Sequence, residues 1–423
     1  MMKRLFLFLF FIFYLLLSFS QHDIFTVGFF SDPSVSYLYS KVWKNSVELF
    51  TITEGNINCQ GHDVFVTEDE NVYVSGIYNE NPYYVGDAII WQNGIPIFTS
   101  LGGYGSKVIV DGSDLYMCGV KRAFYSDIAS VWKNGNILYS MSFSEYGFSA
   151  GAYDMCLANG DIYVAGDQTK VPSIGYSYYA ATVWKNGEVL YDLATTASAA
   201  MSVFVDGDDV YVGGYEVLYG YYQVGRIWKN GEVLYSYAYP DYPDPYHSYA
   251  EVLSVFVANQ DVYAVGKMGP GGNFYVGKLW KNGEELYTFE NYGNSFVDCV
   301  DVIVINNEVY SCCSFFGGSV LGSSKIYKNG DILYDLQHCS ATSMFIIPDS
   351  TISVKKSETN HINVYPNPTS DKITISMSEN SHTALFVLYD IAGRELLRKT
   401  IKHEECIDVS RFVSGVYIYT VES

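Results

Sequence analysis

The sequence has few basic residues: its 423 residues include 25 Lys and Arg against 46 Asp and Glu. The formal net charge of −21 repels phosphate backbones and anionic lipid headgroups. We therefore expect no nucleic-acid partner and no role at an anionic membrane surface.

Cysteine is scarce as well, and eight Cys in a chain of this length do not form a disulfide scaffold. Neither they nor the seven His follow the spacing of metal ligands, so we expect no metal and no cofactor. Cys118 stands where related segments of the chain carry Ser, Ala or Gly, and this predicts that the Cys are mostly buried free thiols. The neighbours Cys312 and Cys313 are not expected to bridge to each other.

Long apolar runs are limited to one, at residues 5–17. Two basic residues precede it and Ser-Phe-Ser at 18–20 follows it, which is the pattern of a secretion signal cleaved before Gln21. A membrane anchor is the alternative, but the run is about five residues shorter than a bilayer span requires. No second candidate follows, so we expect no transmembrane segment in the mature chain.

Aromatic residues are abundant, with 40 Tyr and 25 Phe, and they favour β-structure. The string VWKNGEVLY at residues 183–191 recurs along the chain with small changes. Its aromatic position is filled by Trp43, Trp91, Trp132, Trp184, Trp228, Trp280 and Tyr327, at spacings of 41 to 52 residues. This period is typical of a four-stranded propeller blade.

Each repeat contains two predicted hairpins. The first, such as SVFVDGDDVYVGG at residues 202–214, places two β-branched and aromatic runs around a polar turn. The second contains the Trp and an Asn-Gly turn, which suits a type I′ hairpin because both turn residues tolerate positive φ. Next to that turn we expect Lys185 and Glu188 to form a cross-strand pair.

A lone four-stranded sheet of this kind has two apolar faces, and stacking around a ring buries both, with a Trp in each seam between blades. The first repeat, from Asp23, lacks its innermost strand, and residues 340–347 supply a matching strand at the other end. Six complete blades plus one shared blade predict an all-β, seven-bladed propeller without exposed edges. An open solenoid is the alternative, but it needs capping repeats, and we find none in the sequence.

Three motif matches stand in the wrong context. Residues 147–151 fit a nucleophile-elbow pattern but lie in a predicted loop between blades. Residues 272–278 approximate a phosphate-binding loop, yet Leu279 stands where a Ser or Thr must reach magnesium. The carboxylates of residues 206–209 suggest calcium, but the sister segments are ordinary polar turns. We therefore assign no catalytic constellation.

After Pro348 the repeat ends, and residues 349–360 form a predicted polar linker. Residues 361–423 contain INVYPNPTSDKITI, LYDIAGRELL and IDVSRFVSGVYIYTV, which predict a small Ig-like β-sandwich. This segment resembles the type A C-terminal sorting domain of the type IX secretion system of Bacteroidetes. The matching sorting-signal positions are Pro366, Asn367, Pro368, Asp390, Gly393, Gly415 and Tyr417.

The resemblance implies a secreted Bacteroidetes β-propeller repeat protein. It also implies passage across the outer membrane by the secretion machinery, removal of the tail, and release or attachment at the cell surface. The expected division is a signal peptide at 1–20, a propeller at 21–348, a linker at 349–360 and a sorting domain at 361–423.

For function, the sequence favours a surface binding module for an extracellular glycan or protein. A polysaccharide-active enzyme and a protein-interaction or adhesion scaffold are the alternatives. The connections that vary between repeats emerge on one face of the predicted propeller and are rich in Tyr, a residue suited to recognition. The expected ligand contacts are Tyr83, Tyr125, Tyr178, Tyr221, Tyr242 and Tyr246.

Overall fold

The computed structural model divides the chain into two compact units, Met1–Asp349 and Ser350–Ser423. The regular secondary structure of the described residues consists of strands, without helices. The described residues are 22–31, 37–53, 57–79, 86–123, 126–141, 148–173, 175–239, 248–271, 274–290, 295–317, 320–348, 363–365, 372–376, 384–390, 394–402, 404–412 and 417–422.

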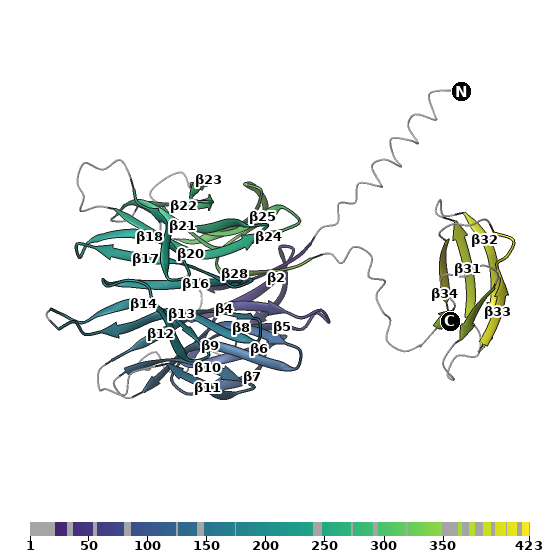
Figure 1. Ribbon diagram of the computed structural model, residues 1–423, viewed down its shortest axis with the longest axis horizontal. Helices are drawn as coiled ribbons and strands as arrows, with labels where there is room; N and C mark the ends of the chain where they lie inside the picture. The colour runs from purple at the N-terminus through teal and green to yellow at the C-terminus, as the bar shows by residue number, and fades with distance from the viewer. Residues whose placement is uncertain are drawn as a thin grey trace, which may run out of the picture. The chain divides into compact units, whose positions relative to one another are not determined.

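Seven four-stranded sheets form the first unit (Figure 1). Blade 1 comprises β28 (Cys339–Ile347), β1 (Asp23–Ser31), β2 (Leu38–Lys44) and β3 (Val47–Ile52). Blade 2 comprises β4 (Asn58–Val66), β5 (Val72–Asn79), β6 (Asp87–Gln92) and β7 (Ile95–Ser100). Blade 3 comprises β8 (Gly103–Asp111), β9 (Asp114–Ala123), β10 (Ser126–Lys133) and β11 (Asn136–Met141).

Four further blades follow in chain order. Blade 4 comprises β12 (Ala150–Ala158), β13 (Asp161–Lys170), β14 (Tyr178–Lys185) and β15 (Glu188–Asp192). Blade 5 comprises β16 (Ser198–Asp206), β17 (Asp209–Leu218), β18 (Tyr222–Lys229) and β19 (Glu232–Tyr237). Blade 6 comprises β20 (Tyr249–Ala258), β21 (Asp261–Gly271), β22 (Phe274–Lys281) and β23 (Glu284–Phe289). Blade 7 comprises β24 (Ser295–Ile305), β25 (Glu308–Gly317), β26 (Val320–Lys328) and β27 (Asp331–Leu336).

The first blade joins the two ends of the propeller sequence. β28 pairs antiparallel with β1, with Asp23 opposite Ile347 and Phe30 opposite Cys339. The innermost strands then contact one another in a closed cycle, β28, β4, β8, β12, β16, β20, β24 and β28 again. Both the seven blades and the shared first blade predicted from the sequence are confirmed.

The repeated Trp fills the seams between blades, as predicted. Trp184 of β14 shares a core cluster with Tyr116 and Cys118 of the preceding blade. Trp228 of β18 does the same with Tyr163, one blade earlier. By buried area alone, each such Trp contributes up to about 4–6 kcal/mol. The seams are therefore the main apolar core of the propeller.

The Asn-Gly turns have the predicted backbone, with φ of 51° at Asn186 and 86° at Gly187. Gly187 is also required by packing, because a Cβ there would lie 2.8 Å from the Tyr139 ring of the preceding blade. Tyr139 ends the same repeated string in its own blade. The turn Gly of one blade thus meets the Tyr or Phe that ends the string in the preceding blade.

The turn Asn also ties two turns together, which the sequence did not reveal. Asn186 Oδ1 accepts a hydrogen bond from Ile162 N at 2.9 Å, and its Nδ2 donates to Asp161 Oδ1 at 2.7 Å. Lys185 Nζ lies 2.7 Å from Asp161 Oδ2. Lys185 and Glu188 are opposite in register, as predicted, but the ion pair of Lys185 forms with Asp161. We call this arrangement of Asn, Asp and Lys the clasp.

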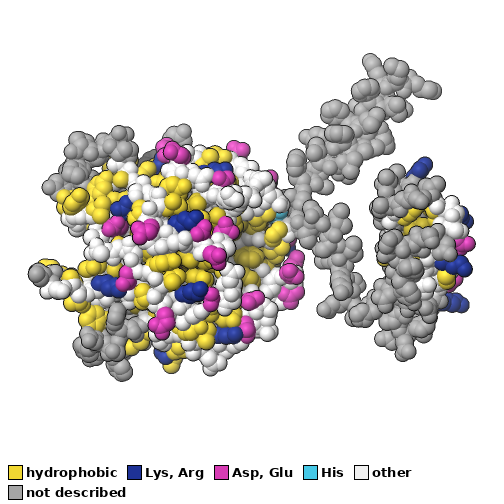
Figure 2. Space-filling view, viewed as in Figure 1, with side chains coloured by type: hydrophobic (Ala, Val, Ile, Leu, Met, Phe, Trp, Pro, Cys, Tyr) yellow, Lys and Arg dark blue, Asp and Glu magenta, His cyan; other side chains and the backbone are white. Residues whose placement is uncertain are grey.

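The clasp recurs around the ring. It is formed by Asn134, Asp114 and Lys133, by Asn230, Asp209 and Lys229, and by Asn282, Asp261 and Lys281. Hydrogen bonds from Lys229 and Asn230 hold the pKa of Asp209 below its ordinary value. Basic and acidic side chains stand close together over the propeller surface in Figure 2, with apolar side chains between them.

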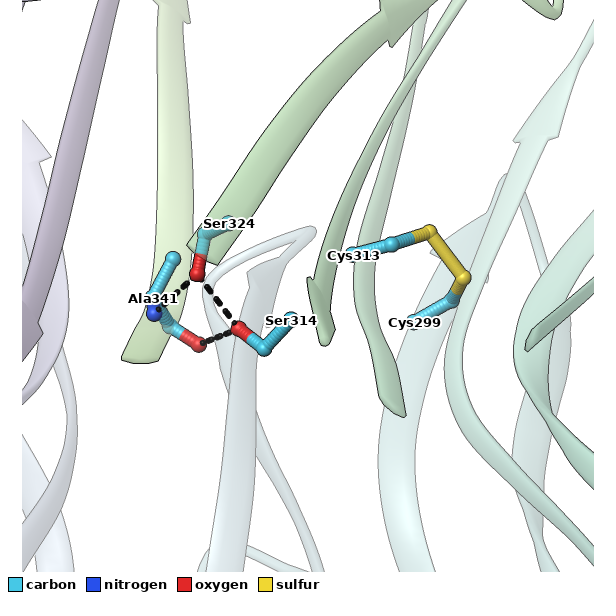
Figure 3. The surroundings of a disulfide bond; sticks show 5 residues. All are labelled: Cys299, Cys313, Ser314, Ser324 and Ala341. Carbon is cyan, nitrogen blue, oxygen red and sulfur yellow. Dashed lines mark hydrogen bonds between the residues drawn. A yellow bond between two sulfur atoms is a disulfide. The ribbon is translucent and has the colours of Figure 1, made fainter. Parts of the chain in front are cut away.

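One cysteine pair departs from the predicted free thiols. Cys299 of β24 and Cys313 of β25 form a disulfide (Figure 3). The two residues are register partners on neighbouring strands, a relation that their spacing in the sequence does not show. Cys118 and Cys312 are buried thiols, as predicted, and Cys312 does not bridge to Cys313.

The second unit contains two three-stranded sheets. One is formed by β29 (Asn363–Tyr365), β30 (Lys372–Ser376) and β33 (Glu404–Asp408). The other is formed by β32 (Glu395–Ile401), β31 (Ala384–Asp390) and β34 (Tyr417–Glu422). Ile375 of the first sheet and Phe386 and Ile401 of the second belong to one buried cluster. The two sheets therefore share a core.

Candidate functional site

The two ends of the blades differ in how far they repeat. At one end, the turn face, the clasp joins the turn between the third and fourth strands to the start of the second strand. At the other end, the loop face, lie the connection between the second and third strands and the connection to the next blade. Variable segments on a rigid, repeated frame are where binding usually resides. The loop face is therefore the candidate face.

Two of the predicted ligand contacts lie in the described part of the chain, on neighbouring blades. Tyr178 is half-buried at the start of β14, and Tyr221 is exposed in the turn between β17 and β18. Both lie on the loop face, near Tyr176 and Tyr219, whose side chains are 95% and 84% exposed. The predicted contacts Tyr83, Tyr125, Tyr242 and Tyr246 lie outside the described residues.

The inner strands of blade 4 add a carboxylate that the sequence did not single out. A bulge in β12 falls at Tyr153, whose hydroxyl donates a hydrogen bond to Asp167 Oδ2 of β13 at 2.8 Å. Gly151 makes this possible, because the Tyr153 ring lies where a side chain on Gly151 would begin: a Cβ there would stand 2.8 Å from the hydroxyl. Asp167 is 8% exposed.

Two more tyrosines lie close enough to Asp167 for its charge to raise their pKa. Burial raises the pKa of Tyr104 to about 12, and nearby carboxylates that include Asp167 add to the shift. Burial and nearby carboxylates, again including Asp167, also raise the pKa of Tyr215. Burial raises the pKa of Asp167 itself to about 6, against hydrogen bonds from Tyr153 and the backbone that lower it. We call Tyr104, Tyr153, Tyr215 and Asp167 the tyrosine box.

A second cluster lies further round the same face, in blades 6 and 7. Lys267 Nζ lies 3.1 Å from Asp298 Oδ1 and 3.6 Å from Glu251 Oε2. The same ammonium stands 5.8 Å from the Tyr249 ring centroid and 5.3 Å from that of Tyr275. Although burial lowers the pKa of Lys267, the charges of Glu251 and Asp298 outweigh it and raise that pKa above its ordinary value. The cluster is thus an ammonium held between carboxylates and aromatic rings.

Closer to the turn face, one side chain from each innermost strand contributes to a polar ring. The ring comprises Asp63, Lys107, Asp154, Ser202, Ser254, Asp301 and Ser343. Asp63 Oδ2 accepts a hydrogen bond from Val108 N of the next blade at 3.0 Å, and Lys107 Nζ lies 3.1 Å from Asp63 Oδ1. These groups join neighbouring blades, so we assign the ring to the scaffold.

The repeats contain a signal for the tyrosine box that residue types alone do not give. The second strand of most blades carries a Gly next to the innermost strand, and the residue after it is apolar in blades 2 and 3, at Ile77 and Val120. The same position holds Asp167, Tyr215 and Lys267 in blades 4, 5 and 6. Aligning the repeats on this Gly exposes the change from apolar to polar side chains.

The rejected motifs have structural roles where they are described. Ser149, the would-be nucleophile, accepts a hydrogen bond from Asp127 N at 3.0 Å and precedes the start of β12. Asp209 belongs to a clasp. In the described part of the chain, no group of three or more His, Cys, Asp or Glu is placed to hold a metal ion.

Comparison with known families concerns the second unit. Residues 363–423 match the family described as the secretion system C-terminal sorting domain. The chain carries a type IX sorting domain. In Bacteroidetes this domain directs secretion and attachment to the outer cell surface, so the secretion machinery is a partner of this chain. None of the described residues forms a helix suited to crossing a bilayer.

Two of the predicted sorting-signal residues are described. Asp390 at the end of β31 pairs in register with Tyr417 at the start of β34, so the sorting domain brings them together. The others, Pro366, Asn367, Pro368, Gly393 and Gly415, lie outside the described residues, as does the predicted signal peptide at 1–20.

No curated protein matches the sequence. Among solved structures, PorZ of the type-IX secretion system of Porphyromonas gingivalis is 13% identical, with a TM-score of 0.38 over 95% of this chain and 56% of that one. A putative 6-phosphogluconolactonase from Bacteroides fragilis is 10% identical, with a TM-score of 0.42 over 78% and 99%. The β-propeller domain of the Trilobed protease from Pyrococcus furiosus is 11% identical, with a TM-score of 0.42 over 71% and 90%. At these values we transfer no activity to this chain.

Proposed function

We propose that the propeller is a binding module at the cell surface and that its loop face recognises an extracellular glycan or protein. The observation that carries the proposal is the contrast between the faces. Clasps repeat on the turn face, whereas the loop face of blades 3 to 5 gathers Tyr104, Tyr153, Asp167 and Tyr215. Exposed Tyr176 and Tyr219 extend the aromatic surface outward on blades 4 and 5. Tyr binds both sugars and proteins, because it offers a rigid ring and a hydroxyl at low entropic cost.

A glycan array and a surface-protein pull-down with the secreted protein would identify the ligand. Once it is known, alanine at Tyr83, Tyr125, Tyr178, Tyr221, Tyr242 or Tyr246, tested one at a time, should weaken binding at least roughly threefold without lowering the melting temperature. Asp208→Ala on the turn face is the matched control and should leave binding unchanged. Loss of binding in Asp208→Ala alone would show that the ligand binds the turn face and not the loop face.

A polysaccharide-active enzyme is the second candidate, and Asp167 favours it. Its pKa of about 6 suits a carboxyl group that donates a proton near neutral pH, and the Tyr153 hydroxyl lies 2.8 Å away. Incubation with mixed polysaccharides should then release reducing ends, and Asp167→Asn should abolish the release. Binding without release excludes this candidate.

For the termini, we propose cleavage before Gln21 and removal of the sorting domain after about Pro348. We also propose that the two sheets of the sorting domain form an Ig-like sandwich, because they share one core. Mass spectrometry of culture medium and washed cells from the native host tests the cleavages. Recovery of full-length protein inside the cell envelope would contradict them.

A further inference from the structure

We infer that the tyrosine box binds a primary ammonium group of the ligand, with Asp167 as its ion partner. The inference rests on the proposed function, because it names the ligand chemistry of the loop face. It concerns Tyr104, Tyr153, Tyr215 and Asp167 and leaves the outer Tyr contacts unchanged.

The first support is a charge without a counterion. Asp167 accepts a hydrogen bond from the Tyr153 hydroxyl, which carries no charge, and none of the ion pairs formed by the described residues includes Asp167. Arg122, on the preceding blade, is held by Asp127, with its Nε 2.6 Å from Oδ1. Arg226, on the following blade, is held by Glu216, with its NH2 2.8 Å from Oε2. The guanidinium groups of Arg122 and Arg226 on the adjoining blades thus have carboxylate partners of their own, and a buried carboxylate favours a cation from outside.

The second support is an ammonium that the same face already holds. The strand position of Asp167 in blade 4 is that of Lys267 in blade 6, since each follows the second-strand Gly in register. Around Lys267, carboxylates of Glu251 and Asp298 and the rings of Tyr249 and Tyr275 form the site. At the equivalent position blade 4 has the complementary group, because the carboxylate of Asp167, with tyrosines near it, replaces the lysine. A ligand ammonium would lie beside the carboxylate and the tyrosine rings of blade 4 as the Lys267 ammonium does in blade 6.

Net charge points the same way. In the two clusters of the loop face, carboxylates outnumber ammonium groups, with Asp167, Glu251 and Asp298 on one side and Lys267 on the other. The chain as a whole carries a formal charge of −21, which attracts cationic ligands over distance at low ionic strength. An acidic sugar or an acidic peptide would be repelled.

Calorimetric titration of the full chain with three probes tests the inference. The probes are a glucosamine tetramer, its fully N-acetylated counterpart and tetralysine, at low ionic strength and neutral pH. We expect at least one ammonium probe to bind roughly tenfold or more tightly than the N-acetylated tetramer, and the two ammonium probes separate an amino sugar from a lysine side chain. Asp167→Asn should lower that affinity at least tenfold.

Two further variants make the result specific. Asp167→Glu keeps the charge and should retain most of the affinity. Asp111→Asn removes one exposed carboxylate at the end of β8, on the turn face, and should leave affinity within about twofold. Melting temperatures of all variants show that each is folded.

Three outcomes would overturn the inference: no binding of either ammonium probe, equal binding of the N-acetylated tetramer, or unchanged affinity in Asp167→Asn. The proposed function fails differently, when an identified surface ligand keeps its affinity in every loop-face Tyr variant. A neutral glycan that depends on the loop-face Tyr but not on Asp167 would therefore remove the ammonium site and leave the binding module standing.

Discussion

The two seams that flank blade 1 are built differently from the other five. Ser40 of β2 and Ser324 of β26 occupy one position of the repeat, three residues before the aromatic residue of the third strand. The remaining blades carry Ala88, Ala129, Ala181, Gly225 and Gly277 there, which have no hydroxyl. Each Ser belongs to one of the two seams by which blade 1 meets its neighbours.

Both hydroxyls make the same pair of bonds across their seams. Ser40 Oγ accepts from Gly61 N at 2.7 Å and donates to Cys59 O at 3.2 Å. Ser324 Oγ accepts from Ala341 N at 2.8 Å and donates to Cys339 O at 3.1 Å. Ser314 Oγ, 2.8 Å from Ser324 Oγ, donates to Ala341 O (Figure 3). Blade 1 is assembled from both ends of the propeller sequence, so β28 and β1 are held together by strand pairing and packing rather than by a connecting turn. The hydroxyls at this position of the repeat add hydrogen bonds to the two seams on either side of it.

The disulfide lies on the other face of blade 7, in the seam with blade 6. In six blades the second strand has a Gly where it meets the innermost strand; at Gly166, for example, a Cβ would lie 1.8 Å from the carbonyl oxygen of Gly151. Blade 7 has Cys313 at this position, bonded to Cys299, and the next residue is Ser314 of the closing seam. Disulfides persist outside the reducing cytosol, which agrees with a secreted protein.

Removal of the closing strand should have the largest effect. A chain ending at Gln337 lacks β28, so blade 1 keeps three strands and exposes an edge. We expect loss of cooperative unfolding or a fall of roughly 10 °C or more in melting temperature. A chain ending at Asp349 keeps β28 and should melt within about 2 °C of the full-length propeller transition. Equal melting of the two truncations would show that β28 does not close the ring.

The ordinary seams should depend most on their Trp. Trp228→Ala removes a fully buried side chain between blades 4 and 5 and should lower the free energy of unfolding by about 3–5 kcal/mol. Denaturant titration measures the loss. Val233→Ala, at an exposed position of β19, is the control and should cost less than about 0.5 kcal/mol.

Reduction of the disulfide should weaken blade 7 by an intermediate amount. Cys299 and Cys313 are 14 residues apart, and a closed loop of this size contributes about 3 kcal/mol by the chain-entropy account. Melting with and without a reductant measures the effect. The double variant Cys299→Ala, Cys313→Gly restores the residue types of sister blades and should no longer respond to the reductant. A response that persists in this variant would assign it to another cysteine.

The seam hydroxyl should have a smaller effect. Ser324→Ala leaves the Ala341 N–H without its partner in a buried seam, at a cost of about 1–3 kcal/mol. Ser130→Ala is a matched control, because Ser130 is equally buried in a third strand but bonds the carbonyl of Ile128 on its own strand. If both variants lose the same stability, the closing seams have no special reinforcement.

The smallest effect concerns pH at the closing seam. Burial raises the pKa of Asp301 to about 6, although its bond from Met344 N and the charge of Lys107 lower it. A carboxyl whose pKa is higher in the folded than in the unfolded state binds more protons when folded. Its contribution to the free energy of unfolding therefore falls as pH rises from about 4 to 6. Asp301→Asn should remove up to about 2 kcal/mol of that decline. Denaturant titrations at pH 4 and pH 7 measure it, and an unchanged decline would place its origin elsewhere.

Most of the fold could be predicted from the sequence, because a propeller repeats one local solution seven times. The Asn-Gly turn, the seam Trp and the spacing each report a local requirement, and residues 340–347 match the missing strand by pattern alone. The sorting domain was likewise recognised from Asp390, Tyr417 and their neighbours. Of the predicted ligand contacts, Tyr178 and Tyr221 lie on the loop face, and their role stays a prediction.

What the sequence by itself determined, then, is the blade, the number of blades and the export route, since each depends on residues near one another in the chain. Only the tertiary structure decided which distant residues meet. The tertiary structure pairs Cys299 with Cys313 in a disulfide and places Tyr104 near Asp167. It also places Lys185 in an ion pair with Asp161 rather than with Glu188. Strand register and the packing of one blade on the next select those partners. The sequence did not predict them, because neither register nor packing can be read from residue types within a single repeat.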